Sequence, residues 1–377
     1  MKLRAPRFRE MRPYNQRLWL AVLVAAAMVV QLSLLIRLLV AIGLAHLPHD
    51  FIAYDAAARH LLAGEPLYDT TATATGGLGL FLYPPSFALL MLPVVLVPTN
   101  VAAPIWMVSL IVVAVIAVWL MPVSRLVRWV LTLMLGLSYP LIDALAQGQV
   151  GPLILLLFAL GWRAMDRPTI LGTALGLGAT IKLQPAVSIG WALLTRRYRA
   201  AAIAIGLAGA LELVATVIVG PGAWADLACV LARTNQPITT EHSVGIARAA
   251  WELGLSSELA QGLYVTSLVL AGAAVVAAVR RGSAVSSYLV AAVASQLLSP
   301  VVWAHYAIVL FLPVAWLVSR GRWWAILILV ATSVPISDVE PAIVYPLVFA
   351  IAILAVLREG QRLREQALPG PGATLGR

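Results

Sequence analysis

The chain has little charge for its 377 residues. Charged residues make up 11% of it and hydrophobic residues 62%, with a mean hydropathy of +0.94. Soluble domains carry about 25% charged residues, so this composition excludes an ordinary soluble protein. Windows of about 20 apolar residues recur along the chain instead, which is the length that crosses the hydrocarbon core of a bilayer. The sequence therefore predicts an all-α, polytopic integral membrane protein.

Cysteine is nearly absent as well. The single Cys229 excludes an intramolecular disulfide and a cysteine-based metal site. The chain also lacks a P-loop, a GxGxxG run after a strand and the HExxH, GxSxG and DxD motifs. Nucleotide-sugar and ATP chemistry therefore have no recognisable site, and we expect no cofactor. No ligand spacing demands a metal ion, and metal dependence stays open.

Acidic residues are scarce, at 16 against 26 basic ones, which gives a net charge of +10. The basic residues flank apolar segments, which is the positive-inside pattern of membrane proteins and suits anionic lipids. Nothing resembles a nucleic-acid-binding module, so we expect membrane lipids and no nucleic acid as partners. The clusters are Lys2, Arg4, Arg7, Arg9, Arg12 and Arg17, then RRYR at 196–199, RR at 280–281 and RGR at 320–322.

We find one membrane domain and no separate soluble one. Residues 1–17 are predicted to be a cytoplasmic basic N-terminus, 18–357 a single membrane domain, and 358–377 a frayed cytoplasmic tail. The run from Leu18 is longer than a signal-peptide core and lacks a cleavage site, so we expect a retained helix. The apolar segments lie near 18–45, 80–98, 101–121, 128–146, 150–164, 169–194, 200–220, 259–279, 284–299, 301–319, 323–336 and 341–357.

Two topologies fit these segments, within a bundle of about 10–12 transmembrane helices. If every segment crosses once, four arginines of the middle segments fall outside, against the positive-inside rule. If 80–98 enters and returns, and 169–194 is two short helices broken at KLQP, those arginines move inside. Gln147, Gln149 and Lys182 then reach the outer face, and the prolines of 80–98 favour this arrangement. The four arginines are Arg125, Arg128, Arg163 and Arg167.

The expected outer loop 46–79 carries a quarter of the acidic residues. Its run FIAYDAAARHLL predicts an amphipathic helix over about 51–63 that ends at Gly64 and Pro66 and lies on the membrane. Asp50 is then either the N-cap of this helix, which stabilises by about 1 kcal/mol, or a functional carboxylate.

The other carboxylates of this loop have simpler explanations. Asp55 and Arg59 are four residues apart on the predicted helix and are expected to pair. Glu65 and Asp69 follow the helix and are expected in a solvated turn.

Lysine is the rarest basic residue, because Lys2 and Lys182 stand against 24 arginines. Lys182 lies inside the apolar run GATIKLQPAV. A compact ammonium there suits a phosphate oxygen as a point charge. A side chain that extends from a helix end toward the membrane surface explains it equally well.

Three further segments place polar groups beside apolar runs. His305 lies in SPVVWAHY, at the outer end of an apolar segment, and is either a hydrogen-bonded structural residue or a group that binds a phosphate or sugar. Gln147 and Gln149 in AQGQVGP can bind a polar ligand or hold helices together. The second expected outer loop, 221–258, is amphipathic and suits a flap over a lipid-facing cavity.

A carboxylate, a lysine, a histidine and amides on one face predict transfer of a group from a lipid phosphate to an alcohol. The carboxylate would take the proton of the acceptor hydroxyl. The cation would stabilise the departing phosphate.

The order of these motifs resembles glycosyltransferase family 87, whose members are membrane enzymes of the GT-C type. D-F-x-x-Y, A-A-R-x-L-L-A-G-x-x-L-Y-D and Y-P-P-x-x-A-L-L-x-x-P open the match. G-Q-V at 148–150, I-K-L-Q-P at 181–185 and S-P-x-x-W-x-H-Y at 299–306 continue it, so that it covers most of residues 45–320. The chain departs from the family at E-H-S, 241–243, where N-Q-S is frequent, and at Tyr306, where a second histidine is frequent.

The resemblance implies a GT-C-like bundle and a hexosyltransferase, typically a mannosyltransferase, of the cell envelope. It implies a polyprenyl-phosphate sugar donor, a lipid or glycan acceptor, and inversion at the anomeric carbon. The active site is then on the outer, periplasmic or extracellular, face of the plasma membrane. Asp50 matches the family's catalytic base, and chemistry assigns Lys182 and His305 to the donor phosphate. The expected substrate-binding residues are Tyr54, Asp55, Arg59, Tyr83, Gln147, Gln149, His242 and Tyr306.

Two other classes of protein compete with a transferase. A flippase or transporter of lipid-linked glycans usually has inverted repeats and paired broken helices, and the sequence shows no internal repeat. A non-catalytic scaffold leaves the acidic loop unexplained. The sugar, the acceptor and the oligomeric state are not determined by the sequence.

Overall fold

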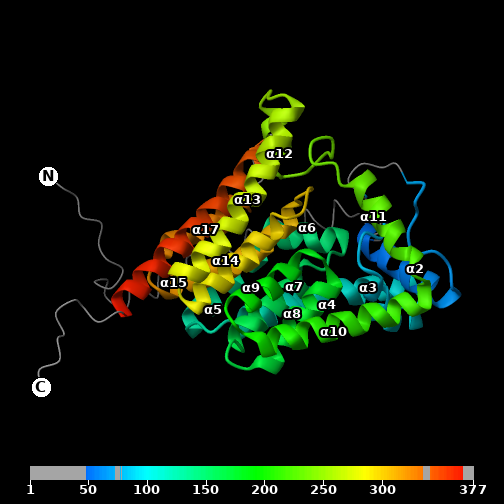
Figure 1. Ribbon diagram of the computed structural model, residues 1–377, viewed down its shortest axis with the longest axis horizontal. Helices are drawn as coiled ribbons and strands as arrows, with labels where there is room; N and C mark the ends of the chain where they lie inside the picture. Colours follow the sequence, from blue (N-terminus) through cyan, green and yellow to red (C-terminus); the bar gives the residue numbers. More distant parts are fainter. Residues whose placement is uncertain (1–47, 73–76, 78, 334–339, 368–377) are drawn as a thin grey trace, which may run out of the picture.

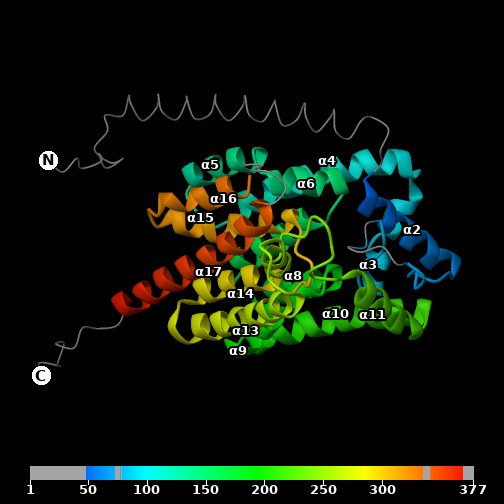
Figure 2. The same cartoon turned by 90° about the horizontal axis from the view of Figure 1, so that it is seen from above.

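The computed structural model describes residues 48–72, 77, 79–333 and 340–367, and these form sixteen α-helices and no strand. The predicted basic N-terminus and the first apolar segment lie outside the described residues. Figure 1 shows the helices, α2 to α17, and Figure 2 shows α4 to α6 along one side with α9, α10 and α13 along the other. The all-α prediction is confirmed.

The helices follow the predicted apolar segments closely. The first half contains α2 His49–Ala63, α3 Pro85–Leu90, α4 Thr99–Leu120, α5 Arg125–Gly136, α6 Tyr139–Gln147, α7 Gly151–Arg163, α8 Pro168–Ile181 and α9 Val187–Leu194. The second half contains α10 Tyr198–Val219, α11 Gly222–Thr234, α12 Ile246–Glu252, α13 Ser257–Arg281, α14 Ala284–Gln296, α15 Phe311–Ser319, α16 Ile326–Ala331 and α17 Glu340–Ala367. Short 3₁₀ turns are η2 Leu92–Leu96, η3 Gln184–Ala186, η4 Ala304–Leu310 and η5 Trp323–Ala325.

Fewer of these helices can cross a bilayer alone than the sequence predicts. Among the described residues, α4, α10, α13 and Ile343–Gln366 of α17 are long and apolar enough, and α5 with α6, bent by 54°, makes a fifth if counted as one span. The other apolar helices have 10–17 residues, which at about 1.5 Å per residue falls short of a hydrocarbon core of about 30 Å. The chain is a multi-pass membrane protein whose bundle includes many short helices.

The segment 80–98 enters the bundle and returns, so that both of its ends lie against α2. At its start, Tyr68 Oη donates to the carbonyl of Tyr83 at 2.7 Å, and the Tyr83 hydroxyl lies 2.7 Å from that of Tyr54 on α2. At its end, Arg59 of α2 donates to the carbonyl of Val97 at 3.4 Å. Both ends of the segment therefore contact α2, as the second of the two topologies requires.

The predicted break at KLQP is also present. Helix α8 ends at Ile181, and Lys182 is extended, with φ −141° and ψ 148°. Pro185 explains the position, because its ring would clash with the carbonyl four residues earlier, at Ile181, if the helix continued. The chain resumes in η3 and α9, so the break sets Lys182 apart from both helices.

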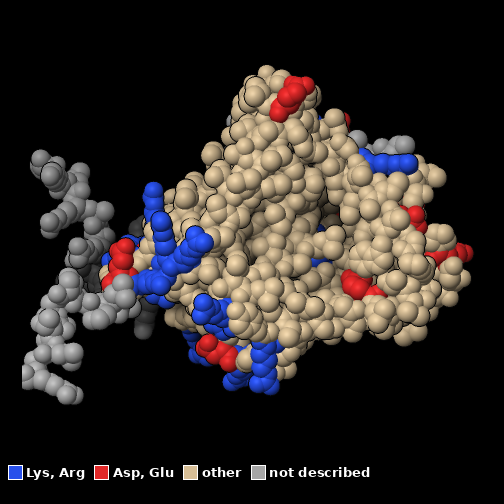
Figure 3. Space-filling view, in the orientation of Figure 1, with Lys and Arg blue, Asp and Glu red and all other residues tan. Residues whose placement is uncertain are grey.

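The arginine-rich connections gather at one end of the molecule. Arg163, the last residue of α7, donates to the carbonyl of Leu120 at 3.5 Å, and Arg197 before α10 lies 3.9 Å from Asp166. Figure 3 shows Lys and Arg over the lower ends of α13, α15 and α17 and over the α9–α10 connection. The arginines of the middle segments therefore lie at the same end of the molecule as the clusters at 196–199, 280–281 and 320–322. This again fits the second topology.

The predicted frayed tail is wrong over its first ten residues. Helix α17 continues to Ala367, well past residue 357. Glu359 explains this, because its carboxylate accepts from Arg322 at 2.9 Å and ties the polar end of α17 to the turn before η5.

Candidate functional site

Helix α2 places Asp50 inside the protein. The helix begins at His49 with Pro48 as its N-cap, and the cap has no side-chain hydrogen bond, so the predicted N-cap role of Asp50 is wrong. Asp50 lies in the first turn and receives a hydrogen bond from Gln149, which makes its carboxylate a partner of a distant amide. The predicted end is confirmed, because Gly64 adopts φ +70° as the C-cap.

More of α2 is buried than a helix lying on a membrane surface would bury. Eight of its 15 residues are buried, and it packs against α3, η2 and α4. Of the predicted apolar face, Phe51 and Ala58 are buried, whereas Leu62 is exposed.

Gly148 allows the start of α2 to approach the link between α6 and α7. Its φ is +73°, and an added Cβ would lie 2.8 Å from the Cβ of Phe51 and 3.0 Å from that of Pro48. Its carbonyl accepts from Trp106 Nε1 at 2.8 Å. Gly148 therefore lets Asp50 come within hydrogen-bonding distance of Gln149, because a larger residue at 148 would clash with Pro48 and Phe51.

Gly148→Ala is expected to lower the free energy of unfolding by about 1–3 kcal/mol, because it combines left-handed backbone strain with this contact. Thermal unfolding in detergent measures the loss. Gly190→Ala on α9 is the control, because its Cβ would meet nothing within 4 Å. Equal unfolding temperatures for the two variants would contradict the close approach of α2.

Asp50 faces a cavity of about 460 Å³ that opens between the halves of the bundle. The hollow is visible in Figure 3 between the α12–α13 side and the α11 side. Its walls come from α2, the loop before α3, the α6–α7 link, the break after α8, the end of α11 and the chain after α14. The side chains with polar or aromatic groups at these walls are Asp50, Tyr83, Gln147, Gln149, Lys182, Gln184, Asn235, Ser299, Trp303 and Tyr306.

Burial is the main influence on the Asp50 carboxylate, which is 8% exposed. Desolvation raises the pKa of Asp50 to about 7, while the charge of Lys182 and the hydrogen bond from Gln149 lower it and the charge of Asp143 raises it. A carboxylate whose pKa lies near neutrality can take a proton and is still ionised in a large share of molecules.

Lys182 presents its ammonium group between two aromatic rings at the cavity wall. Nζ lies 4.4 Å from the ring centroid of Tyr306 and 5.6 Å from that of Tyr83. No carboxylate of the described residues lies within 4.0 Å of it. An ammonium held by ring faces, without an ion pair, remains able to bind an anion.

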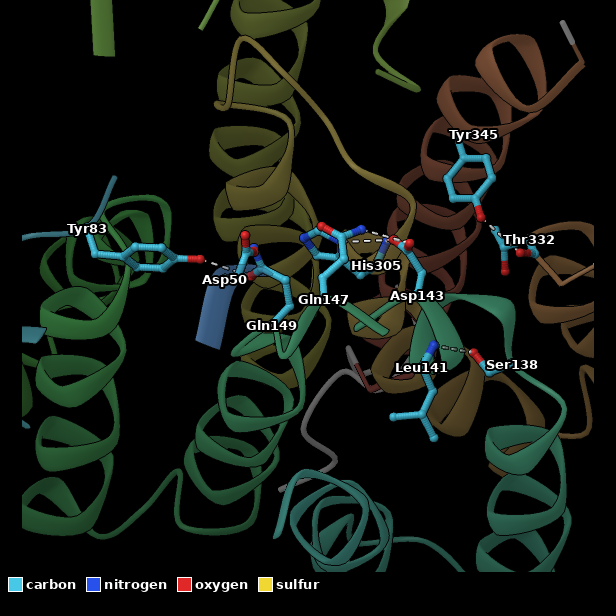
Figure 4. A network of polar contacts seen from close by, with 10 residues as sticks. All are labelled: Asp50, Tyr83, Ser138, Leu141, Asp143, Gln147, Gln149, His305, Thr332 and Tyr345. Carbon is cyan, nitrogen blue, oxygen red and sulfur yellow. Dashed lines mark hydrogen bonds and ion pairs between the residues drawn. The ribbon is translucent and has the colours of Figure 1, made fainter. Parts of the chain in front are cut away.

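Asp143 and His305 form a second polar unit beside the cavity, and Figure 4 shows it next to Asp50 and Gln149. Asp143 Oδ2 accepts from the backbone N–H of His305 at 3.2 Å and lies 3.0 Å from its Nδ1, while Oδ1 accepts from Gln147 at 2.8 Å. Since a carboxylate only accepts, Nδ1 carries the proton. His305 is 1% exposed, and its Nε2 has no partner among the described residues.

Asp143→Ala is expected to lower the free energy of unfolding by about 3–5 kcal/mol, because a buried histidine, a backbone N–H and an amide lose their acceptor. Asp166→Ala is the matched control, because the side chain of Asp166 is 98% exposed and its nearest cation is 3.9 Å away. Thermal unfolding of both variants in the same detergent measures the difference. Similar small losses for the two would contradict the structural role of Asp143.

Several predicted site residues lie outside the cavity wall. Asp55 accepts two hydrogen bonds from Arg59 at 3.0 Å and one from Thr99 at 2.6 Å, so the predicted pair with Arg59 is confirmed. Tyr54 is fully buried behind Tyr83. His242 is exposed in the turn before α12 with φ +61°. These residues, like His305, do not line the cavity.

Other predictions fit the structure directly. Glu65 and Asp69 are exposed, as expected of a solvated turn. Tyr83, Gln147, Gln149, Lys182 and Tyr306 line the cavity together with Asp50. The expected outer loop 221–258 contributes Leu231, Ala232 and Asn235 to the wall.

Sequence reasoning missed Asp143, Gln184, Asn235 and Trp303. Asp143 had a usable signal, because it is an acidic residue inside an apolar segment, where charges are expensive. Gln184 adjoins the recognised break, and Trp303 lies inside the recognised SPVVWAHY motif. Nothing in the local sequence marks Asn235.

Comparisons with known proteins identify the family of this chain. The profile of glycosyltransferase family 87 matches residues 81–300, which is more than half of the chain. A protein of Mycobacterium tuberculosis (strain ATCC 25618 / H37Rv), named polyprenol-phosphate-mannose-dependent alpha-(1-2)-phosphatidylinositol mannoside mannosyltransferase, is 27% identical over 293 residues, or 69% of this chain and 68% of the relative. No solved structure matches. The matched range includes Lys182, Gln147 and Gln149, whereas Asp50 and His305 lie outside it.

Proposed function

The chain belongs to glycosyltransferase family 87 and is a membrane glycosyltransferase, and we propose that it moves a mannosyl group from a polyprenyl-phosphate donor to a hydroxyl of a lipid or glycan acceptor. One observation carries this proposal: a buried carboxylate, Asp50, and an ammonium with no ion pair to any described residue, Lys182, line the same cavity. The sugar and the lipid-linked donor are supported by the name of the mycobacterial relative.

In the proposed reaction Asp50 is the general base. It takes the proton of the acceptor hydroxyl, and the oxygen attacks the anomeric carbon from the side opposite the phosphate. The bond between that carbon and the phosphate oxygen breaks, and the phosphate leaves with the electron pair. A single displacement of this kind inverts the anomeric configuration.

Lys182 is proposed to bind the leaving phosphate. Its ammonium would stabilise the negative charge that grows on the phosphate as the bond breaks. The support is its place at the cavity wall and its lack of a carboxylate partner in the described part of the chain. His305 is proposed to join it at the phosphate; it lies behind the wall, its ring centroid is 5.0 Å from that of Tyr306, and its Nε2 has no partner among the described residues.

We further propose that the site faces the outer side of the plasma membrane. The arginine-rich connections gather at the end of the molecule away from the cavity (Figure 3), and positive connections face the cytoplasm. A cavity on the outer face suits a donor that is held in the membrane by a polyprenyl chain.

Incubation of the purified protein with polyprenyl-phosphate mannose and a lipid extract as acceptor tests this function. We expect release of free polyprenyl phosphate together with a mannosylated lipid. A flippase or transporter would leave the donor intact, so an unchanged donor with every acceptor fraction tried would contradict transfer.

A further inference from the structure

The side chain of Gln149 lies between Tyr83 and Asp50 (Figure 4). The hydroxyl of Tyr83 donates to Gln149 Oε1 at 2.9 Å, and Gln149 Nε2 donates to Asp50 Oδ2. Gln149 is only 6% exposed, so water cannot readily replace either partner. The sequence predicts that this amide binds substrate, and the structure adds that each of its ends already has a protein partner.

The partners of Gln149 decide which end of its amide faces Asp50. The oxygen and nitrogen of an amide have nearly the same shape, so packing alone does not distinguish them. A carboxylate accepts only, so ionised Asp50 requires the NH₂ group. At the other end, the hydroxyl of Tyr83 donates a hydrogen bond and therefore requires the amide oxygen. Both partners thus select the same orientation of the amide.

The direction of the Tyr83 hydroxyl is itself fixed by Tyr54. The two hydroxyl oxygens are 2.7 Å apart, and Tyr54 is fully buried with no other hydrogen-bond partner among the described residues. If Tyr83 donated to Tyr54, the hydrogen of Tyr54 would be buried without an acceptor, at a cost. Burial also raises the pKa of both phenols well above the ordinary value, so both hydroxyls keep their protons.

We infer that Gln149 is a positioning residue for Asp50, and that Tyr83 holds its amide in the orientation that supports the carboxylate. The inference rests on the proposed role of Asp50 as the base. It also assigns the two oxygens of Asp50. Oδ2 receives Gln149, whereas Oδ1 accepts no hydrogen bond from the described residues and is the atom left for the proton of the acceptor.

Loss of the Tyr83 hydroxyl has a consequence for pH dependence. Without it, the amide of Gln149 can turn its oxygen toward Asp50 and accept a hydrogen bond from the protonated carboxyl. The protonated form of Asp50 then gains a partner, and its pKa rises. The other titratable groups of this region are not substituted in this variant: Lys182, Asp143 and Tyr54 interact with Asp50, Tyr306 interacts with Tyr54 and Tyr83, and His305 pairs with Asp143.

The pH dependence of the transfer rate tests this inference. A base acts when ionised, so the wild-type rate falls as the pH drops through the pKa of Asp50. Tyr83→Phe is expected to move the midpoint upward by about half a pH unit or more, and Gln149→Met, of similar length but without a hydrogen bond, by about one unit. At high pH both variants approach their full rates, which a general loss of folding would not allow.

Tyr68→Phe is the matched control, because Tyr68 also loses a buried hydroxyl, one that donates to the backbone of Tyr83 and not to the amide. It is expected to keep the wild-type midpoint. A rate that falls by the same factor at every pH in Tyr83→Phe and Gln149→Met would overturn the inference.

Asp50→Asn in the same series separates this inference from the proposed function. If Asp50→Asn transfers at the wild-type rate, the role of Asp50 as base is wrong. If Asp50→Asn is inactive but Tyr83→Phe and Gln149→Met keep the wild-type midpoint, the positioning role alone is wrong.

Discussion

Asp50→Asn is expected to lower the transfer rate by about 10²–10⁴-fold, the contribution of a general base. Asparagine has nearly the same shape, and its oxygen can still accept the hydrogen bond from Gln149. The cavity therefore keeps its geometry while the group that takes the proton is lost. Initial rates of polyprenyl-phosphate release measure the change, and thermal unfolding checks that the variant still folds.

Asp69→Asn is the matched control for Asp50→Asn. Asp69 lies in the same stretch of chain but is exposed, and its Oδ1 accepts only from Thr71 at 2.9 Å and 2.5 Å. It is expected to transfer at the wild-type rate. An Asp50→Asn protein that folds and keeps more than about a tenth of the wild-type rate would contradict a base contribution of this size.

Lys182→Met is expected to have the second largest effect. It replaces the ammonium with an apolar side chain that still fits between the rings of Tyr83 and Tyr306. The departing phosphate then loses its cation, and kcat/KM for the donor is expected to fall by about 10²–10³-fold, as when an electrostatic stabiliser is removed. Lys182→Arg is expected to recover only part of this loss, because a planar guanidinium fits a compact ammonium site poorly.

Steady-state kinetics with polyprenyl-phosphate mannose, and the affinity for polyprenyl phosphate as product, measure the effect of Lys182. Arg199→Met serves as a control, because Arg199 is an exposed cation in the first turn of α10, beside the arginine-rich α9–α10 connection. Unchanged kcat/KM and unchanged product affinity in Lys182→Met would remove this lysine from the donor site.

Local sequence signals predicted the breaks of the chain well. Gly64 ends α2 because a glycine accepts the left-handed backbone, and Pro185 ends α8 at the carbonyl with which its ring would clash. The prolines of 80–98 favoured its return as one of two topologies, and the positive-inside rule favoured a shared end for the arginines. Each of these features depends on residues within a few positions of one another.

Contacts between distant residues were harder to predict. The sequence left Asp50 as either the N-cap of its own helix or a functional carboxylate, and did not indicate that it pairs with Gln149, 99 positions away. Asp143 was missed because its importance comes from His305, 162 positions away. Tyr83 lines the cavity, but the sequence did not indicate that its hydroxyl contacts Tyr54 and Gln149. A pattern of residue types places a carboxylate near a site, but only the packed bundle determines which group it meets.

The anomeric configuration of the transferred sugar tests the central claim most directly, namely that Asp50 acts as a base in a single displacement. The purified protein is supplied with a polyprenyl-phosphate mannose of known configuration, and the new glycosidic bond is examined by NMR. The account predicts a product whose configuration is opposite to that of the donor. A product that keeps the configuration of the donor would require two displacements and a covalent sugar intermediate, and would contradict the assignment of Asp50 as general base.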